Sequence, residues 1–116
     1  MSILNSRLQG YSAQEYKGKL IVDGVEEFGE QITAFNGVMQ EFYRGSVNGL
    51  KACRYLDLEA LIEKLKEKRA KRDELEKKFA DDGSEKSEKE YWYAKGIVSE
   101  MEHIYKELQL FNFKFA

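Results

Sequence analysis

The sequence predicts a mainly helical protein with a long antiparallel helical hairpin in its C-terminal half. Two observations support this fold class. Apolar residues recur at three- and four-residue steps from Asp57 to Phe79 and again from Ser87 to Phe111, the period of one face of an α-helix. Between the two runs, residues 80–87 are polar and rich in turn-forming types. We therefore predict a single domain over residues 1–116, made of an N-terminal half at 1–55 and a coiled-coil-like hairpin at 56–112.

The N-terminal half begins with a segment of no clear period. Residues 1–16 mix apolar and polar side chains irregularly, so we expect an arm or a short irregular segment there. The triplet Leu20, Ile21 and Val22 follows, bounded by Gly18 and Gly24. Such a short apolar run between glycines is typical of a β-strand.

Residues 23–45 carry two competing patterns. Apolar residues fall at helical steps through the whole segment, whereas Asn36 and Gly37 form the dipeptide that most often closes a tight β-hairpin. The helical period spans more residues, so we favour a third helix. The alternative is a small β-sheet, which would make the protein α+β. We interpret residues 46–56 as a connector into the hairpin.

The first helix of the hairpin has a well-marked start and a polar middle. Asp57 is a typical N-cap, because its carboxylate can accept a hydrogen bond from a free backbone N–H of the first turn. Farther along, Lys68 and Arg72 occupy positions of the apolar stripe. A dry interface cannot accommodate them, so we expect polar groups or solvent opposite these two residues.

The second helix of the hairpin carries a broad apolar face. We place its start at Ser87, which with Glu90 matches the S-x-x-E capping box. Gly96 lies inside the helical run and indicates close approach of another backbone, a slight bend, or simple tolerance. The apolar faces of the two helices are too wide to cover each other fully. A third element or a second chain should complete the core, so we expect a homo-oligomer, a dimer or larger.

Composition excludes several classes of protein. The net charge of -2 argues against general nucleic-acid binding, and no apolar stretch is long enough to cross a membrane. The first ten residues lack the apolar core of a signal peptide. Cys53 is the single cysteine and cannot form an internal disulfide. We expect a cytoplasmic protein.

No catalytic or metal-binding pattern is present. His103 is the single histidine and has no second ligand at a recognised spacing. Cys53 has no neighbouring base, so we interpret it as a buried, unreactive thiol rather than a nucleophile. The sequence predicts a protein that is not an enzyme, with no catalytic residues, no metal site and no cofactor.

Two surface patterns are candidates for binding. The first helix of the hairpin carries a basic stretch from Lys64 to Arg72, which either follows a phosphate backbone or pairs with acidic residues one turn away. The second helix opens with three consecutive aromatic residues, Tyr91, Trp92 and Tyr93. A helix must point these three in different directions, so at least one is available to a partner or a stacked base.

The sequence resembles a family of phage proteins. A Y-W-Y-x-K-G motif at Tyr91–Gly96 opens the last helix, Arg54 lies at the base of the hairpin and Phe79 near its tip, a layout similar to the anti-Thoeris proteins. The resemblance implies a non-enzymatic oligomer that sequesters cyclic nucleotides or cyclic ADP-ribose-type signals in a host cell. It further implies that Arg54 and Lys106 hold phosphate groups while Phe79 or Trp92 stacks on a base.

Two other functions remain open at this point. The chain can be a helical adaptor or inhibitor that docks directly onto a host protein, with Tyr91, Trp92 and Tyr93 at the centre of the contact. Alternatively, it is a DNA-binding regulator that uses Lys64 to Arg72. All three functions describe a binding protein rather than an enzyme.

Overall fold

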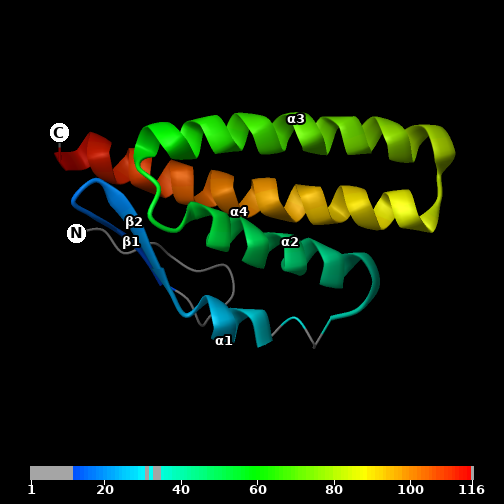
Figure 1. Ribbon diagram of the computed structural model, residues 1–116, viewed down its shortest axis with the longest axis horizontal. Coiled ribbons are helices and arrows are strands. Elements are labelled where there is room, and N and C mark those ends of the chain that lie inside the picture. Colours follow the sequence, from blue (N-terminus) through cyan, green and yellow to red (C-terminus); the bar gives the residue numbers. More distant parts are fainter. Residues whose placement is uncertain (1–11, 31, 33–34, 116) are drawn as a thin grey trace.

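The computed structural model describes residues 12–30, 32 and 35–115, and its architecture is mainly helical (Figure 1). This confirms the predicted fold class. The elements in chain order are β1 (Ser12–Tyr16), β2 (Lys19–Asp23), α1 (Val25–Glu30), α2 (Gly37–Cys53), α3 (Leu58–Asp82) and α4 (Glu85–Phe115). The helices α3 and α4 form the predicted antiparallel hairpin.

Three long helices lie side by side in one layer. Helix α4 is in the middle and packs against α3 on one side and α2 on the other (Figure 1). We call the end of this layer at Gly83 and Ser84 the tip, and the end at residues 54–57 the base. The strands β1 and β2 lie toward the base, and the tip consists of the ends of long helices and the chain segments next to them (Figure 1).

The two strands form an antiparallel hairpin in which Ser12 pairs with Asp23 and Tyr16 with Lys19. This confirms a strand at residues 20–22 and shows that the expectation of irregular structure up to residue 16 was wrong for 12–16; residues 1–11 lie outside the described part. The other edge of β2 joins the base, because the N–H of Leu20 donates to Leu56 (2.9 Å) and the N–H of Tyr55 donates to Leu20 (2.7 Å). The small sheet therefore involves residues 12–23 and not the Asn36–Gly37 hairpin considered above.

The prediction of one helix over residues 23–45 was wrong, because two separate helices, α1 and α2, share this segment. Residues up to Asp23 belong to β2, α1 ends at Glu30, and α2 begins only at Gly37. Gly24 and Gly37 have φ of 81° and 58°, values that glycine adopts easily, while Asn36 has the extended conformation of an N-cap. The Asn–Gly pair thus starts a helix instead of closing a hairpin.

Helix α2 continues through the segment that we interpreted as a connector, and it covers α4 at very short range. A Cβ atom built at Gly96 would overlap the carbonyl oxygen of Phe42, and one built at Gly45 would overlap that of Tyr93. At Gly49 it would lie 2.9 Å from the carbonyl oxygen of Ile97. Glycines at these three positions let the two backbones touch. The third element that completes the hairpin therefore comes from the same chain.

The interface between α3 and α4 has the polar middle that the sequence predicted. Glu102 of α4 accepts a hydrogen bond from Arg69 Nε (3.1 Å) and lies 3.7 Å from the guanidinium of Arg72. The start of α3 is also as predicted, because the carboxylate of Asp57 accepts from the N–H of Ala60 (2.8 Å). The polar group opposite Arg72 is thus a carboxylate.

The tip is capped differently from the prediction. Helix α4 starts at Glu85, so Ser84 rather than Ser87 is its N-cap, and the N–H of Ser87 donates to the Ser84 hydroxyl (3.1 Å). Asp82 then accepts from the N–H of Ser84 (2.8 Å) and from the buried Ser87 hydroxyl (2.6 Å). The proposed capping box failed because Ser84 offers the same chemistry three residues earlier, directly after Gly83 ends α3 with a left-handed φ of 62°.

The hydrophobic core lies toward the base. Its buried members come from β2, α1, the second half of α2, the start of α3 and the middle of α4: Leu20, Val22, Val25, Val47, Leu50, Cys53, Leu61, Leu65, Val98, Met101 and Ile104. At the tip, in residues 37–46, 70–82 and 85–97, the structure buries a single hydrophobic side chain, that of Ala94. The tip is therefore held by backbone contact, capping and partly exposed aromatic side chains.

Candidate functional site: an aromatic row at the tip

Six aromatic rings form a continuous row across the tip. We call Phe35, Tyr43, Phe42, Trp92, Tyr91 and Phe79, in that order, the aromatic row. Successive ring centroids are 4.5, 5.4, 6.1, 6.1 and 6.3 Å apart. These are distances at which aromatic rings attract one another. The row starts beside α2, crosses α4 and ends on α3, so three helices and the segment before α2 contribute to one surface.

The rings of the row are half-buried. Each covers part of its neighbours but keeps part of its own surface in water. Near them, the side chain of Met39 on α2 is 43% exposed and lies one helical turn before Phe42 and Tyr43. The row therefore presents an apolar, aromatic surface at the end of the molecule that lacks a core.

A lysine lies against the centre of the row. The ammonium nitrogen of Lys95 is 4.5 Å from the ring centroid of Trp92 and 5.6 Å from that of Tyr91. Both distances are within the range of cation–π attraction. Lys95 reaches the two rings because residues three and four positions apart are neighbours on a helix.

A carboxylate lies at the edge of the same pair of rings. The hydroxyl of Tyr91 donates a hydrogen bond to Glu76 of α3 (3.2 Å). Partial burial of the ring, followed by the negative charge of Glu76, raises the pKa of Tyr91 above its ordinary value. The phenol therefore stays protonated at neutral pH and holds α4 to α3 at this point.

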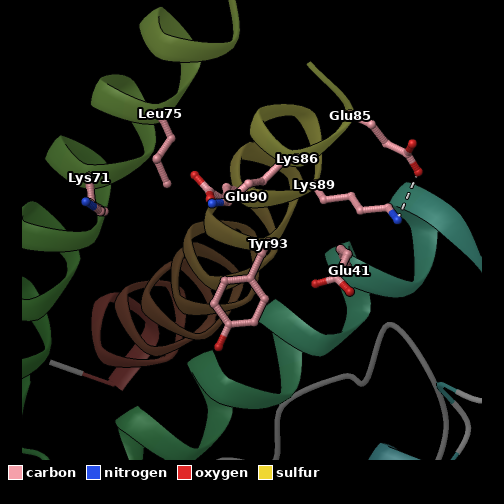
Figure 2. A pocket seen from close by; sticks show the side chains of 8 residues that line it. All are labelled: Glu41, Lys71, Leu75, Glu85, Lys86, Lys89, Glu90 and Tyr93. Atoms are coloured by element: carbon pink, nitrogen blue, oxygen red, sulfur yellow. Dashed lines mark ion pairs between the residues drawn. The ribbon is translucent and has the colours of Figure 1, made fainter. Parts of the chain in front are cut away.

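Tyr93, the third consecutive aromatic residue, does not belong to the row. It projects from α4 toward α2 (Figure 2), where its hydroxyl is hydrogen-bonded to the side-chain amide of Asn48. Tyr93 lines an open groove of about 780 Å³ together with Glu41, Lys71, Leu75, Glu85, Lys86, Lys89 and Glu90. Because successive helical residues differ by about 100° in direction, this groove and the aromatic row occupy different sides of α4.

The groove carries three lysines and three glutamates, and most of them are already paired. Lys89 is paired with Glu85 at 3.1 Å, Lys71 with Glu74 at 3.5 Å and Glu90 with Lys78 at 3.2 Å. The opposing charges cancel over a short distance, so the groove offers no concentrated field for an anion or a cation. We therefore regard the aromatic row, rather than the groove, as the candidate site.

The four residues that the resemblance assigns to a ligand fall at opposite ends of the layer. Arg54 follows α2 at the base and donates to Glu26 of α1 at 3.3 Å. Lys106 is exposed in the C-terminal part of α4, on the base side of the core residue Ile104. Phe79 and Trp92 lie at the tip, in the aromatic row. The 25 residues of α3 separate the two groups by roughly 35 Å at 1.5 Å per residue, so one chain does not bring them together.

The basic stretch of α3 is largely neutralised by acidic neighbours. Lys66 pairs with Glu63 at 3.6 Å, Lys71 with Glu74, and both Arg69 and Arg72 with Glu102. Cations that follow a phosphate backbone bind by replacing the counterions condensed on it, and a cation already paired with a carboxylate must first give up that pair. The contacts favour the interpretation of this stretch as a self-paired helix surface over a DNA-binding surface.

Sequence reasoning placed part of the row and missed the rest. It selected Phe79, Tyr91 and Trp92, but it placed Phe35, Phe42 and Tyr43 only within the predicted helix at residues 23–45 and gave Lys95 no role. The spacing of Lys95 from Tyr91 and Trp92 was a usable signal, since side chains at i+3 and i+4 meet on a helix. Phe42 and Tyr43 join the row because α2 packs against α4. The spacing of Gly45 and Gly49 on α2 was a usable signal for this close helix packing.

The described residues form neither a metal-binding cluster nor a helix that could cross a membrane. Within residues 12–30, 32 and 35–115, histidine, cysteine, aspartate and glutamate side chains do not gather in groups of three or more that could hold a metal ion. Of the helices described, none has the length and apolar character needed to span a membrane.

No protein-family model, curated protein or solved structure matches this chain. The resemblance to the anti-Thoeris proteins therefore stays a prediction.

Proposed function

We propose that this chain is a non-enzymatic binding protein that docks onto another protein through the aromatic row. The observation that carries the proposal is the contrast between the two ends of the molecule. Fully buried hydrophobic side chains cluster toward the base, whereas the tip holds six half-buried rings in one continuous row. A second protein that covers this row would remove the remaining aromatic surface from water.

The shape of the row suits a protein better than a small ligand. It extends over parts of three helices as a surface, and the groove lined by Tyr93 lies on another side of α4. Tryptophan and tyrosine dominate the energetics of many protein interfaces, because their rings bury a large area at a small cost in side-chain entropy. Trp92 lies near the middle of the row and is the expected centre of the contact.

Affinity purification followed by calorimetry tests this proposal. The parent chain and the variant Trp92→Ser are used as baits in cells that produce the protein, with Lys66→Ser as a matched control because Lys66 is an exposed residue of α3 away from the row. A protein recovered with the parent is then purified and titrated against each variant. We expect Trp92→Ser to weaken binding by about 30-fold or more, equivalent to about 2 kcal/mol. Lys66→Ser should bind as the parent does.

Circular dichroism must first show that both variants are folded. Equal affinity of a folded Trp92→Ser variant and the parent would contradict docking through the row. A partner that loses affinity for Lys66→Ser instead would place the contact on the outer surface of α3.

A second candidate function is sequestration of a nucleotide, in agreement with the family resemblance. Lys95 favours it, because this residue places a cation beside the ring faces of Trp92 and Tyr91, and a nucleotide needs both a stacking surface and a charge partner. If Arg54 and Lys106 also hold the ligand, two chains must pack with the base of one near the tip of the other. This candidate therefore requires an oligomer.

Native mass spectrometry distinguishes the two candidates. The protein is purified from cells in which nucleotide-based defence signalling is active, and the mass of the assembly and of any small molecule released on unfolding is recorded. An oligomer that releases a nucleotide would support sequestration. A chain that carries a protein partner and releases no nucleotide would support docking.

A further inference from the structure

The pair Tyr91 and Trp92 forms a corner that is filled by the chain's own lysine. The two ring planes are inclined at 59°, with their centroids 6.1 Å apart, and the ammonium group of Lys95 lies over both rings. Two inclined aromatic faces around one cation form two walls of the kind that make up an aromatic cage.

The environment of Lys95 differs from that of its neighbours. Lys78 and Lys89, on either side of the tip, each lie within 3.2 Å of a glutamate oxygen. Lys95 makes no such pair with a described residue; its contacts in the described part of the chain are the two ring faces. A lysine on a surface rich in carboxylates is thus held by aromatic rings instead of an acidic group.

Glu76 strengthens the preference of this corner for a positive charge. Its carboxylate accepts the hydrogen bond of the Tyr91 hydroxyl and lies at the rim of the corner. The negative ring faces and the nearby carboxylate both attract a cation, and the carboxylate disfavours an anion.

We propose that the Tyr91–Trp92 corner is a binding site for an organic cation and that Lys95 occupies it in the free protein. The cation is the arginine, lysine or methylated lysine side chain of a protein partner, which displaces Lys95 when it binds. The assignment of this cation to a protein partner rests on the proposed docking function, whereas the cation site itself does not depend on it. Lys95 is attached by four flexible bonds, so it can move into water without a change in the fold.

Tryptophan fluorescence tests the site directly, because Trp92 is the single tryptophan of the chain. The probe is tetramethylammonium chloride, which is compared with sodium chloride at the same ionic strength. In the variant Lys95→Gln the corner is empty, and we expect a saturable change in fluorescence with tetramethylammonium but not with sodium. The parent should bind the probe about fivefold more weakly, because its own lysine competes for the same ring faces.

Two further variants serve as controls. Lys95→Arg keeps a tethered cation and should behave as the parent does, and the double variant Tyr91→Leu/Lys95→Gln lacks one wall of the corner and should lose saturable binding. Thermal unfolding of each variant, followed by circular dichroism, shows whether it remains folded. The proposal is overturned if Lys95→Gln responds to both salts alike, or if the folded double variant binds tetramethylammonium as tightly as Lys95→Gln.

The outcome is independent of the partner experiment. Saturable binding to Lys95→Gln together with unchanged partner affinity in Trp92→Ser would establish the cation site and contradict docking through the row. The reverse result would support docking while showing that Lys95 does not occupy a cation site.

Discussion

The carbonyl oxygen of Phe42 occupies the position that a side chain at Gly96 would need. A Cβ atom added at residue 96 would overlap this oxygen and lie 2.8 Å from the Phe42 carbonyl carbon and 3.1 Å from the nitrogen of Ser46. Phe42 is itself a member of the aromatic row, and its ring lies 6.1 Å from that of Trp92. The close approach of α2 and α4 at Gly96 therefore places the two central rings of the row next to each other.

Gly96→Ala should destabilise the protein and disrupt the row. The methyl group meets backbone atoms that cannot rotate away, so α2 must shift from α4, at a cost of about 3 kcal/mol or more. Chemical denaturation followed by circular dichroism measures the loss. Gly29→Ala is the matched control, because its Cβ would find no atom closer than 4.0 Å and alanine is the better helix former. A Gly96→Ala variant as stable as the parent would contradict the packing of α2 on α4.

Glu102→Gln should weaken the hairpin at its polar middle. Glu102 is 26% exposed at its side chain and is shared by Arg69 and Arg72, so the loss of its charge should lower the free energy of unfolding by about 1 kcal/mol. Salt screens the interaction, and the difference from the parent should shrink in 1 M NaCl. Lys66→Gln removes an exposed ion pair with Glu63 and should change stability by less than about 0.5 kcal/mol. Equal effects of the two substitutions would show that Glu102 has no special role.

Asp82→Asn should loosen the tip in a pH-dependent manner. Hydrogen bonds from the Ser84 N–H, and then from the Ser87 hydroxyl, hold the pKa of Asp82 below its ordinary value. Since the folded-state pKa is the lower one, this stabilisation is present above the unfolded pKa of 3.8 and is lost as the pH falls through the folded value.

The measurement is the thermal unfolding of Asp82→Asn and of the parent at pH 7 and at pH 3. We expect a Tm a few degrees lower for the variant at pH 7 and a smaller difference at pH 3. Asp81→Asn is the control, because Asp81 is exposed in the same turn of α3. A difference between Asp82→Asn and the parent that does not depend on pH would argue against the charged cap.

Cys53 should be unreactive while the chain is folded. Burial, followed by the negative charge of Glu100, raises the pKa of its thiol to about 12, so almost no thiolate exists at pH 8. We expect a disulfide reagent to modify Cys53 only as fast as the protein unfolds. A variant with Cys53→Ala and Ala70→Cys, which moves the thiol to an exposed position of α3, should react at once.

The same pKa shift makes stability depend on pH in the alkaline range. The contribution of the buried thiol is complete below the unfolded pKa of about 9 and is lost as the pH rises toward 12. The parent should therefore lose more of its unfolding free energy between pH 9 and pH 11 than Cys53→Ala does. Rapid modification of folded parent protein, or identical pH profiles, would show that Cys53 is accessible.

The helical hairpin and its polar middle could be predicted because local signals determine them. Asp57 begins α3, the apolar period continues through α3 and α4, and Arg72 within the stripe requires a polar partner, which is Glu102. The division of residues 23–45 could not be predicted in this way. The apolar residues of α1 and α2 continue one helical period across residues 31–36, so the pattern contains no break, and Asn36 with Gly37 is compatible with a helix start as well as with a hairpin.

The aromatic row is a product of tertiary packing. Tyr91 and Trp92 are adjacent in sequence and were recognised, but Phe42 joins them only because glycines at 45, 49 and 96 bring two backbones together. The family resemblance implied that Arg54 and Phe79 bind the same ligand. Both residues belong to the hairpin region, but the length of α3 keeps them apart in the folded chain.

The measurement that tests the central claim most directly is site-specific photo-crosslinking in cells that produce the protein. A photoreactive phenylalanine is placed at Met39, an exposed position beside the row, and in a second variant at Ala70, an exposed position on the outer part of α3. Docking through the row predicts a discrete crosslinked protein from position 39 that disappears when Trp92→Ser is added, and no such product from position 70. The same product from position 70, or its persistence at position 39 in the folded Trp92→Ser variant, would contradict the claim.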